Sequence, residues 1–109
     1  MNDNSNLPED SLSSYLSMAN DLQLPIKKKQ EYNKKAFDII VEQSNDSLNR
    51  VNLFKVANRY YNMNDWKGFN KTVEIVLENS KTSKDTINTA KAFIYLGDYY
   101  SAQGVSDSA

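Results

Sequence analysis

The chain has 109 residues, of which 39% are hydrophobic and 25% are charged, and its formal net charge is −1. It contains no cysteine and no histidine. This composition excludes disulfides, thiolate zinc sites, cysteine nucleophiles and histidine general bases, and the charge provides no long-range field to attract nucleic acid. No apolar stretch approaches the ~20 residues that a membrane span needs, and the polar N-terminus carries no export signal.

A triplet of Asp, then Ser or Thr, then an aliphatic residue recurs ahead of helix-period segments. The copies are Asp10-Ser11-Leu12, Asp46-Ser47-Leu48 and Asp85-Thr86-Ile87. Asp and Ser favour helix starts because their side-chain oxygens accept hydrogen bonds from backbone N–H groups that the first turn leaves unpaired. Spacings of 36 and 39 residues are typical of stacked helical hairpins, which bury their apolar sides against one another.

The N-terminal third predicts a disordered segment over residues 1–9 and then two helices. A first helix is expected over 10–22, because its apolar residues follow the spacing of one buried stripe: Leu12, Tyr15, Leu16 and Ala19. Pro25 is expected in the first turn of a second helix that ends near Gln43, because its missing N–H costs nothing there. The lysines from Lys27 to Lys35 are either a solvated face or a contact for nucleic acid or acidic lipid.

The middle of the chain predicts a third helix that ends near Met63 and a fourth that begins near Trp66. Apolar residues cover more than half of the third helix, so it needs neighbours on two sides. A narrower polar arc remains, which comprises Asn52, Lys55, Asn58, Arg59 and Asn62. Asn64-Asp65 is expected to be the turn and cap between these helices, with Trp66 anchoring the hairpin.

A fifth helix is expected over 86–103, with Gly104 as a left-handed C-terminal stop. Asp107-Ser108 then predicts another helix start, as if the sequence were cut at the beginning of a sixth helix. The fold class predicted is all-α, an α-solenoid of antiparallel helical hairpins with about five helices. Its repeating units are expected over 10–44, 45–83 and 84–109, the last of them truncated.

Residues 93–104 resemble the first helix of a tetratricopeptide repeat. The positions that match the family pattern are Phe93, Leu96, Gly97, Tyr100, Gly104 and Ala109, and the preceding unit fits more loosely with Leu53, Val56, Ala57, Tyr60, Asn64 and Phe69. The resemblance implies that Ala57 and Gly97 allow close helix approach, and that Tyr60 and Tyr100 pack in the core. Residues 46–109 are also similar to the sensor region of bacterial tetratricopeptide-containing histidine kinases and regulators.

In that family the first helix of each unit lines a concave groove that binds partners. The resemblance implies the following contact residues here: Asn58, Tyr61, Asn62, Asp98, Ser101 and Ala102. Lys55 and Lys91 are expected to add attraction for a carboxylate. Asn amides both donate and accept hydrogen bonds, so they can hold an extended peptide backbone. The alternative is that these are solvated polar positions, with Tyr61 and Tyr99 near the surface.

The function expected is a non-catalytic protein or peptide interaction module, the input part of a signalling protein. The alternative is an RNA-binding helical repeat that uses Lys27 to Lys35. The acid pairs Asp38/Glu42 and Glu74/Glu78 are interpreted as solvated charges, so no enzyme activity, cofactor or metal is predicted. Self-association through residues 86–103 is expected if their apolar side is uncovered. The compartment stays open: periplasmic for the sensor of a membrane kinase, otherwise cytoplasmic.

Overall fold

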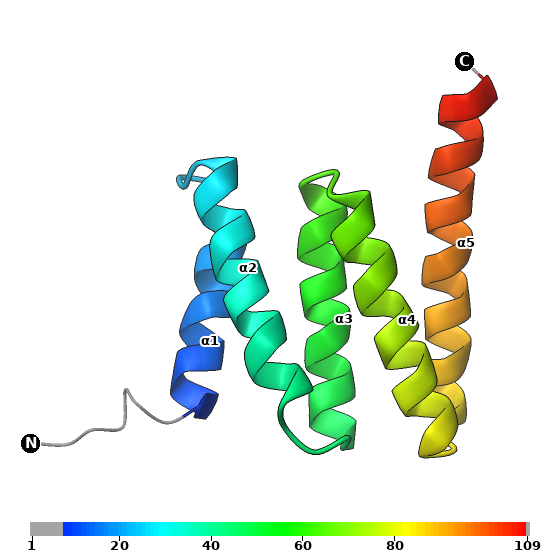
Figure 1. Cartoon of the computed structure of the whole chain (residues 1–109), viewed down its shortest axis with the longest axis horizontal. Helices are drawn as coiled ribbons and strands as arrows, with labels where there is room; N and C mark the ends of the chain where they lie inside the picture. Colours follow the sequence, from blue (N-terminus) through cyan, green and yellow to red (C-terminus); the bar gives the residue numbers. More distant parts are fainter. Residues whose placement is uncertain (1–7, 109) are drawn as a thin grey trace, which may run out of the picture.

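The computed structural model describes residues 8–108, with side chains over 11–104, and contains five α-helices and no strand in that part of the chain (Figure 1). The helices are α1 (Pro8–Ala19), α2 (Ile26–Val41), α3 (Ser47–Asn62), α4 (Trp66–Thr82) and α5 (Thr86–Ser108). The predicted all-α class with five helices is confirmed. Residues 1–7, where disorder was expected, and Ala109 lie outside the described part. Within 8–108, no helix is long and apolar enough to cross a membrane.

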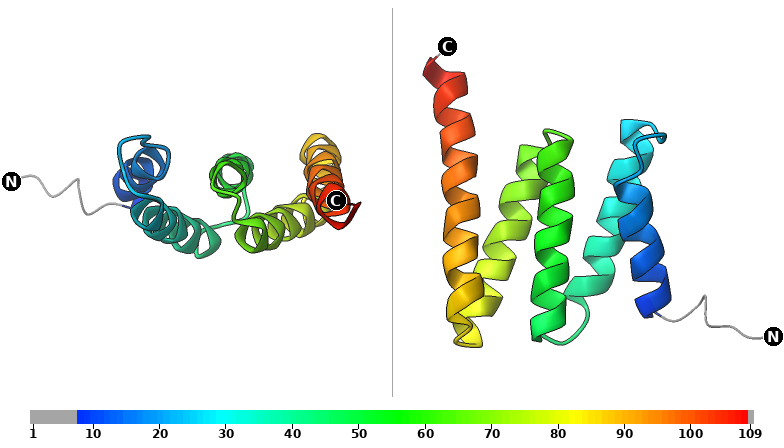
Figure 2. Two further views of the ribbon diagram at one scale, coloured as in Figure 1. Left: turned by 90° about the horizontal axis from the view of Figure 1, so that it is seen from above. Right: turned by 180° about the vertical axis from the view of Figure 1, so that it is seen from behind.

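The helices form a slab in which each one packs against the next along the chain. Seen from above, α1, α3 and α5 lie on one side of the slab and α2 and α4 on the other (Figure 2). α3 contacts α1, α2 and α4, so it lies at the centre. This position gives α3 neighbours on two sides, as its wide apolar surface requires.

Asp46, Asp65 and Asp85 cap the three C-terminal helices as predicted. Their carboxylates accept hydrogen bonds from the backbone N–H of Asn49, Gly68 and Asn88, at 2.9, 3.0 and 3.1 Å. The first triplet behaves differently, because α1 begins at Pro8 and Asp10 already lies inside it. The prediction of a helix start at Asp10 is therefore wrong: Pro8 has the fixed φ that suits a first turn. α1 also ends earlier than expected, at Ala19.

The left-handed helix stops lie at two residues other than the one predicted. Asn64 (φ 58°) and Lys84 (φ 57°) adopt this conformation, whereas no glycine has a positive φ. α5 continues through Gly104 to Ser108, so the predicted stop at Gly104 and the new helix start at Asp107 are both wrong. The helix continues through Gly104, because extending an existing helix by one residue is easier than starting a new one.

The core is continuous through all five helices and is deepest around α3. Its largest fully buried side chains include Phe54, Leu53 and Val56 from α3, together with Phe69 from α4 and Ile40 from α2. Around this core lies a chain of aromatic contacts: Phe54 meets Tyr95 edge-on at 5.0 Å, and Phe69 stacks on Tyr95 at 6.1 Å. These rings join α5 to the preceding hairpin.

The tyrosine pairs were predicted correctly in α3 and incorrectly in α5. Tyr60 is buried and Tyr61 is 41% exposed, as expected. In α5, Tyr100 is 62% exposed, whereas Tyr99 is half-buried and stacks on Phe69 at 6.4 Å. The reason is that the stripe of α5 that contains Ala92 and Tyr99 faces α4, whereas the face that contains Tyr100 points away from α4.

A close approach between α3 and α4 is found at Gly68, where the Tyr60 ring leaves no space for a side chain. A Cβ at Gly68 would lie 2.8 Å from the ring of Tyr60, whereas nothing lies within 4 Å of a Cβ built on Gly97. The role implied for Gly97 is therefore not seen. Ala57 is fully buried, in keeping with the role implied for it.

Polar networks fix the α3 helix relative to its neighbours. Arg50, which is 8% exposed, donates from Nε to Asp85 at 2.8 Å and from Nη1 to the side chains of Asn45 and Ser83 at 2.7 and 3.0 Å. Hydrogen bonds from the N–H and amide of Asn88, and then from Arg50, hold the pKa of Asp85 below its ordinary value. On the other side, the buried Asn33 amide donates to the Val56 carbonyl at 3.1 Å.

Candidate interaction groove

A groove runs between α1 and α3 on the side of the slab that carries α1, α3 and α5. It consists of two hollows, of about 730 and 200 Å³, which share Ser13, Leu16 and Lys55. We call it the α1–α3 groove. Its other lining residues are Leu12, Ser17, Asn20, Asp21, Leu22, Gln23, Gln43, Leu48, Asn49, Asn52 and Arg59. Amides and hydroxyls are thus interspersed with aliphatic side chains, as in sites that bind extended polypeptide.

Asn52 supplies the most informative group in the groove. Its side chain is only 8% exposed, and it makes no hydrogen bond to any residue over 8–108. Asn49, its neighbour on the same face, already donates to the Ser44 carbonyl at 2.6 Å. The amide nitrogen and oxygen of Asn52 are not among the fully buried, unpaired polar atoms of the described residues, so they reach solvent at the groove surface. Asn52 therefore offers a donor and an acceptor to a molecule in the groove.

Two cations, Lys55 and Arg59, lie along the α3 side of the groove. Arg59 is held in place because its Nε donates to the Leu16 carbonyl at 3.0 Å and its Nη1 to the Lys55 carbonyl at 3.1 Å. Burial lowers the pKa of Arg59 from its ordinary value. Lys55 is exposed, so its ammonium group is available to an anionic group of a ligand.

Of the eight residues predicted to contact a partner, only Lys55 lines the α1–α3 groove. Asn58 and Asn62 are exposed on the same helix. Tyr61 packs edge-on against Trp66 at 5.0 Å and Phe69 at 5.5 Å, so it helps to anchor the α3–α4 hairpin. Trp66 is half-buried in this cluster, as its predicted role requires.

The predicted residues of α5 lie outside this groove. Lys91, Asp98 and Ser101 are exposed, and Ala102 is half-buried. The Lys91 ammonium lies over the ring of Phe54, 4.6 Å from its centroid, which ties it to the α3–α5 contact. These residues are not brought together with Lys55 into one site.

Sequence reasoning missed the contribution of α1 and of the buried Asn52. The family pattern directed attention to the first helices of the second and third units, whereas Ser13, Ser17 and Asn20 come from the first unit. A signal was present in the polar arc of α3, because Asn52 and Arg59 each lie about one helical turn from Lys55. The arc alone does not show that α1 covers part of it.

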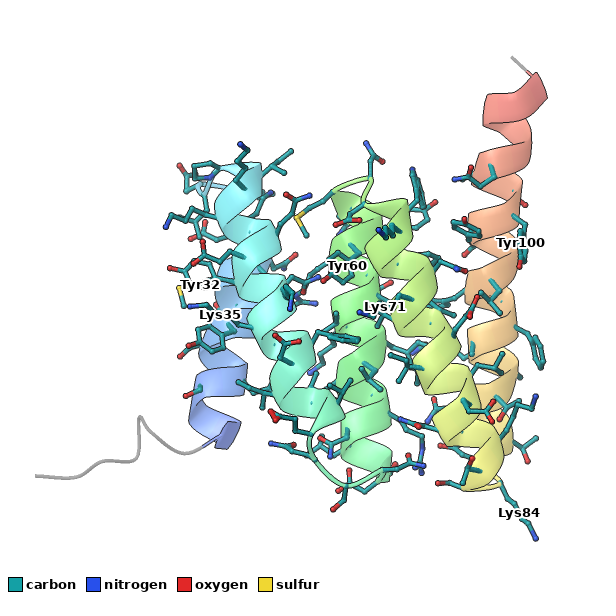
Figure 3. The ribbon with its side chains drawn as sticks, viewed as in Figure 1. Tyr32, Lys35, Tyr60, Lys71, Lys84 and Tyr100 are labelled. Carbon is teal, nitrogen blue, oxygen red and sulfur yellow. The ribbon has the colours of Figure 1, made fainter. Side chains whose placement is uncertain are left out.

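A second hollow, of about 220 Å³, opens on the opposite side of the slab between α2 and α4. It is lined by Lys34, Phe37, Tyr60, Asp65, Lys67, Gly68, Lys71 and Thr72. Figure 3 shows Tyr60 and Lys71 near one another on this side. Burial, and then the charges of Asp65 and Asp38, raise the pKa of Tyr60 to about 12. The three lysines make this α2–α4 hollow the more basic of the two sites.

The lysine-rich part of α2 is partly neutralised by its own acids. Lys28 and Lys35 both lie 3.9 Å from Glu31, and Lys34 lies 3.1 Å from Asp38. Asp38 and Glu74, members of the two acid pairs, contact Lys34 and Asn70 on exposed surface. Within the described residues, no group of three or more acidic side chains is arranged to hold a metal ion.

Comparisons with family models, with curated proteins and with solved structures found no match for this chain.

Proposed function

We propose that this protein is a non-catalytic interaction module that binds an extended peptide in the α1–α3 groove. The observation that carries the proposal is Asn52, a largely buried residue on the groove wall whose amide opens to solvent and has no hydrogen-bond partner among residues 8–108. An amide of this kind can pair with both the N–H and the C=O of a peptide backbone.

The charges in the groove indicate the kind of peptide. Lys55 and Arg59 lie together on α3, and Asp21 stands at the end formed by the α1–α2 turn. A peptide with an acidic side chain facing Lys55 is favoured, and a basic peptide is disfavoured. Leu12, Leu16 and Leu48 provide apolar contacts for an aliphatic side chain of the ligand.

The proposal is tested with peptides selected from a phage-displayed random library. Replacing Asn52 by Leu, which has a similar volume, removes the unpaired amide. We expect Asn52→Leu to maintain or raise the free energy of unfolding, while weakening peptide binding about tenfold, equivalent to ~1.4 kcal/mol. Fluorescence anisotropy measures the affinity, and urea unfolding measures the stability.

Asn70→Leu is the matched control. Asn70 has a buried, unpaired side-chain oxygen and lies on α4, outside the groove. This variant should bind selected peptides as the unmodified protein does. Equal loss of binding in both variants, or selected peptides that protect only α4 and α5 from hydrogen exchange, would overturn the proposal.

We further propose that the slab is a short tetratricopeptide-like solenoid in which α1–α2 and α3–α4 are the repeating hairpins. The alternation of helices between two sides of the slab (Figure 2) supports this arrangement. A sensor or regulatory role follows from peptide recognition without chemistry, since such modules transmit binding to another part of a signalling protein. Changes in hydrogen exchange that spread beyond the groove when peptide binds would support that role.

The α2–α4 hollow favours a second candidate function, RNA binding. It adds Lys67 and Lys71 of α4 to the lysines of α2 and places Phe37 and Tyr60 beside them. Basic and aromatic side chains together suit single-stranded nucleic acid. Oligo(U) binding that weakens steeply with salt, and that Lys67→Gln/Lys71→Gln abolishes, is the expected result; absence of binding at low salt would dismiss this candidate.

A further inference from the structure

The outer face of α5 carries the largest group of exposed apolar side chains in the described part of the chain. Ile87, Phe93, Ile94 and Tyr100 are 80%, 55%, 65% and 62% exposed. Figure 3 shows Tyr100 on the side of α5 turned away from α4, and Figure 1 shows that the C-terminal turns of α5 extend past the ends of its neighbours. A group of exposed large apolar side chains on one helix marks a candidate interaction site.

The residues of this face follow a seven-residue pattern of small and large side chains. Ala90, Gly97 and Gly104 recur every seven positions, and Phe93 and Tyr100 recur every seven positions between them. A Cβ at Gly97 or Gly104 would meet nothing within 4 Å. The glycines therefore form depressions beside the two protruding rings, which is the arrangement that knobs-into-holes packing requires.

We propose that two copies of this protein associate through α5, with the two helices antiparallel. In one register, Phe93 of each copy lies over the partner's Gly97, and Ala90 then lies opposite the partner's Tyr100. The same register places Thr86 opposite the partner's Gly104. Every layer pairs one small residue with one larger one, so the face is complementary to itself, as a two-fold interface must be.

The charges on the edge of this face fit the antiparallel orientation. Lys91 and Asp98, both exposed, are the charged residues on this flank of α5. In the proposed register, Lys91 stands level with the partner's Asp98 on the same flank, so its ammonium exchanges the Phe54 ring for that carboxylate, and this pairing occurs twice. In a parallel pair, Lys91 would stand beside the partner's Lys91, and Asp98 beside the partner's Asp98, which is unfavourable.

Ile94 lies close to the two-fold axis and therefore faces the partner's Ile94. The experiment compares Ile94→Gln with Ile26→Gln, because Ile26 on α2 is also exposed, at 54%, but lies outside α5 and the α1–α3 groove. Sedimentation equilibrium should show a dimer for the unmodified protein and for Ile26→Gln. Ile94→Gln should raise the dissociation constant at least about tenfold, as expected for a central interface residue.

Disulfide trapping tests the orientation, because the chain contains no cysteine. Ile94→Cys should cross-link with its own copy, whereas Ile87→Cys should cross-link only when mixed with Ser101→Cys. Asp98→Lys should weaken the dimer, and adding Lys91→Glu should restore it. A monomer at every concentration would overturn the proposal and leave the α5 face to a different chain. Self-linking of Ile87→Cys would overturn the antiparallel register. Peptide binding in the α1–α3 groove is independent of each of these outcomes.

Discussion

Helices α3 and α5 carry the same pattern of residues forty positions apart, but their surroundings differ. Leu53 and Tyr60 of α3 are 1% and 8% exposed, whereas their counterparts in α5, Phe93 and Tyr100, are 55% and 62% exposed. α3 packs against α1, α2 and α4, while α5 packs chiefly against α4. The comparison shows that a repeat pattern specifies which side chains are able to form a core, and that neighbouring helices determine whether they do so.

The largest expected difference between the two helices is in the cost of truncating matched side chains. Leu53→Ala should lower the free energy of unfolding by about 2–5 kcal/mol, because it leaves a cavity in a core with little freedom to collapse. Phe93→Ala should change it by less than about 0.5 kcal/mol at low protein concentration. Urea unfolding of both variants provides the measurement. Similar losses in both would mean that α5 is covered in solution.

A second difference lies in the polar connection that follows α3. Arg50 joins α3 to the start of α5 through Asp85, whereas its counterpart in α5 is Ala90. Arg50→Met should cost about 2–3 kcal/mol, because it leaves the Asn45 side-chain oxygen without a donor and removes the charged partner of Asp85, which keeps only its hydrogen bonds from Asn88. The exposed Lys34–Asp38 pair is the control, and Lys34→Met should cost less than about 0.5 kcal/mol. Stability unchanged by Arg50→Met would show that the network contributes nothing.

The two glycines sharpen the comparison further, because they should respond in opposite directions. Gly68→Ala should destabilise the protein by about 1–3 kcal/mol, since the added methyl group would lie 2.8 Å from the ring of Tyr60 and must displace it. Gly97→Ala should stabilise it by up to about 1 kcal/mol, because Ala is the better helix former and the space is open. Thermal unfolding followed by circular dichroism distinguishes the two results. Destabilisation by Gly97→Ala in the monomer would contradict the open surface of α5.

The last expected effect appears only at high pH, in the alkaline stability that Tyr60 controls. Its pKa of about 12 in the folded protein exceeds the ordinary value near 10, so the stabilisation is fully present below about pH 10 and is lost as the pH rises towards 12. The loss at pH 11 is about 1.4 kcal/mol. Tyr60→Phe should remove this pH dependence, whereas Tyr100→Phe should leave it intact. Unfolding measured between pH 9 and pH 12 tests the difference, and an unchanged slope in Tyr60→Phe would refute it.

Much of the fold was predictable, because its signals are local. The caps at Asp46, Asp65 and Asp85 follow from side-chain chemistry within one turn, and the apolar stripes give the helices between them. The exposure of Tyr100 was not predictable in this way, since it depends on which elements lie beside α5. The stop at Lys84 was also missed, because a lysine with positive φ has no compositional signal, whereas Gly104 has one that the structure does not use.

The α1–α3 groove was harder to predict than the fold. Lys55 was identified from its position on the polar arc, but Arg59 acquires its place from the Leu16 carbonyl, 43 residues away in the chain. In the sequence, Asn52 is indistinguishable from a solvated amide, because its burial results from the packing of α1 against α3. Contacts of this range depend on how the helices pack, and periodicity within one helix does not contain that information.

The corners after α3 and α4 have the same construction. In each, a left-handed residue is followed by an Asp whose N–H donates back to the helix just ended, to Tyr60 at 2.9 Å or Ser80 at 2.8 Å. That same Asp caps the next helix, so a single residue takes part in ending one helix and in starting the next, with no linker between the two roles. The joint is therefore interchangeable: its geometry does not depend on the helices it connects. Whole helices could therefore be added to or removed from such an assembly without changing the geometry of its corners.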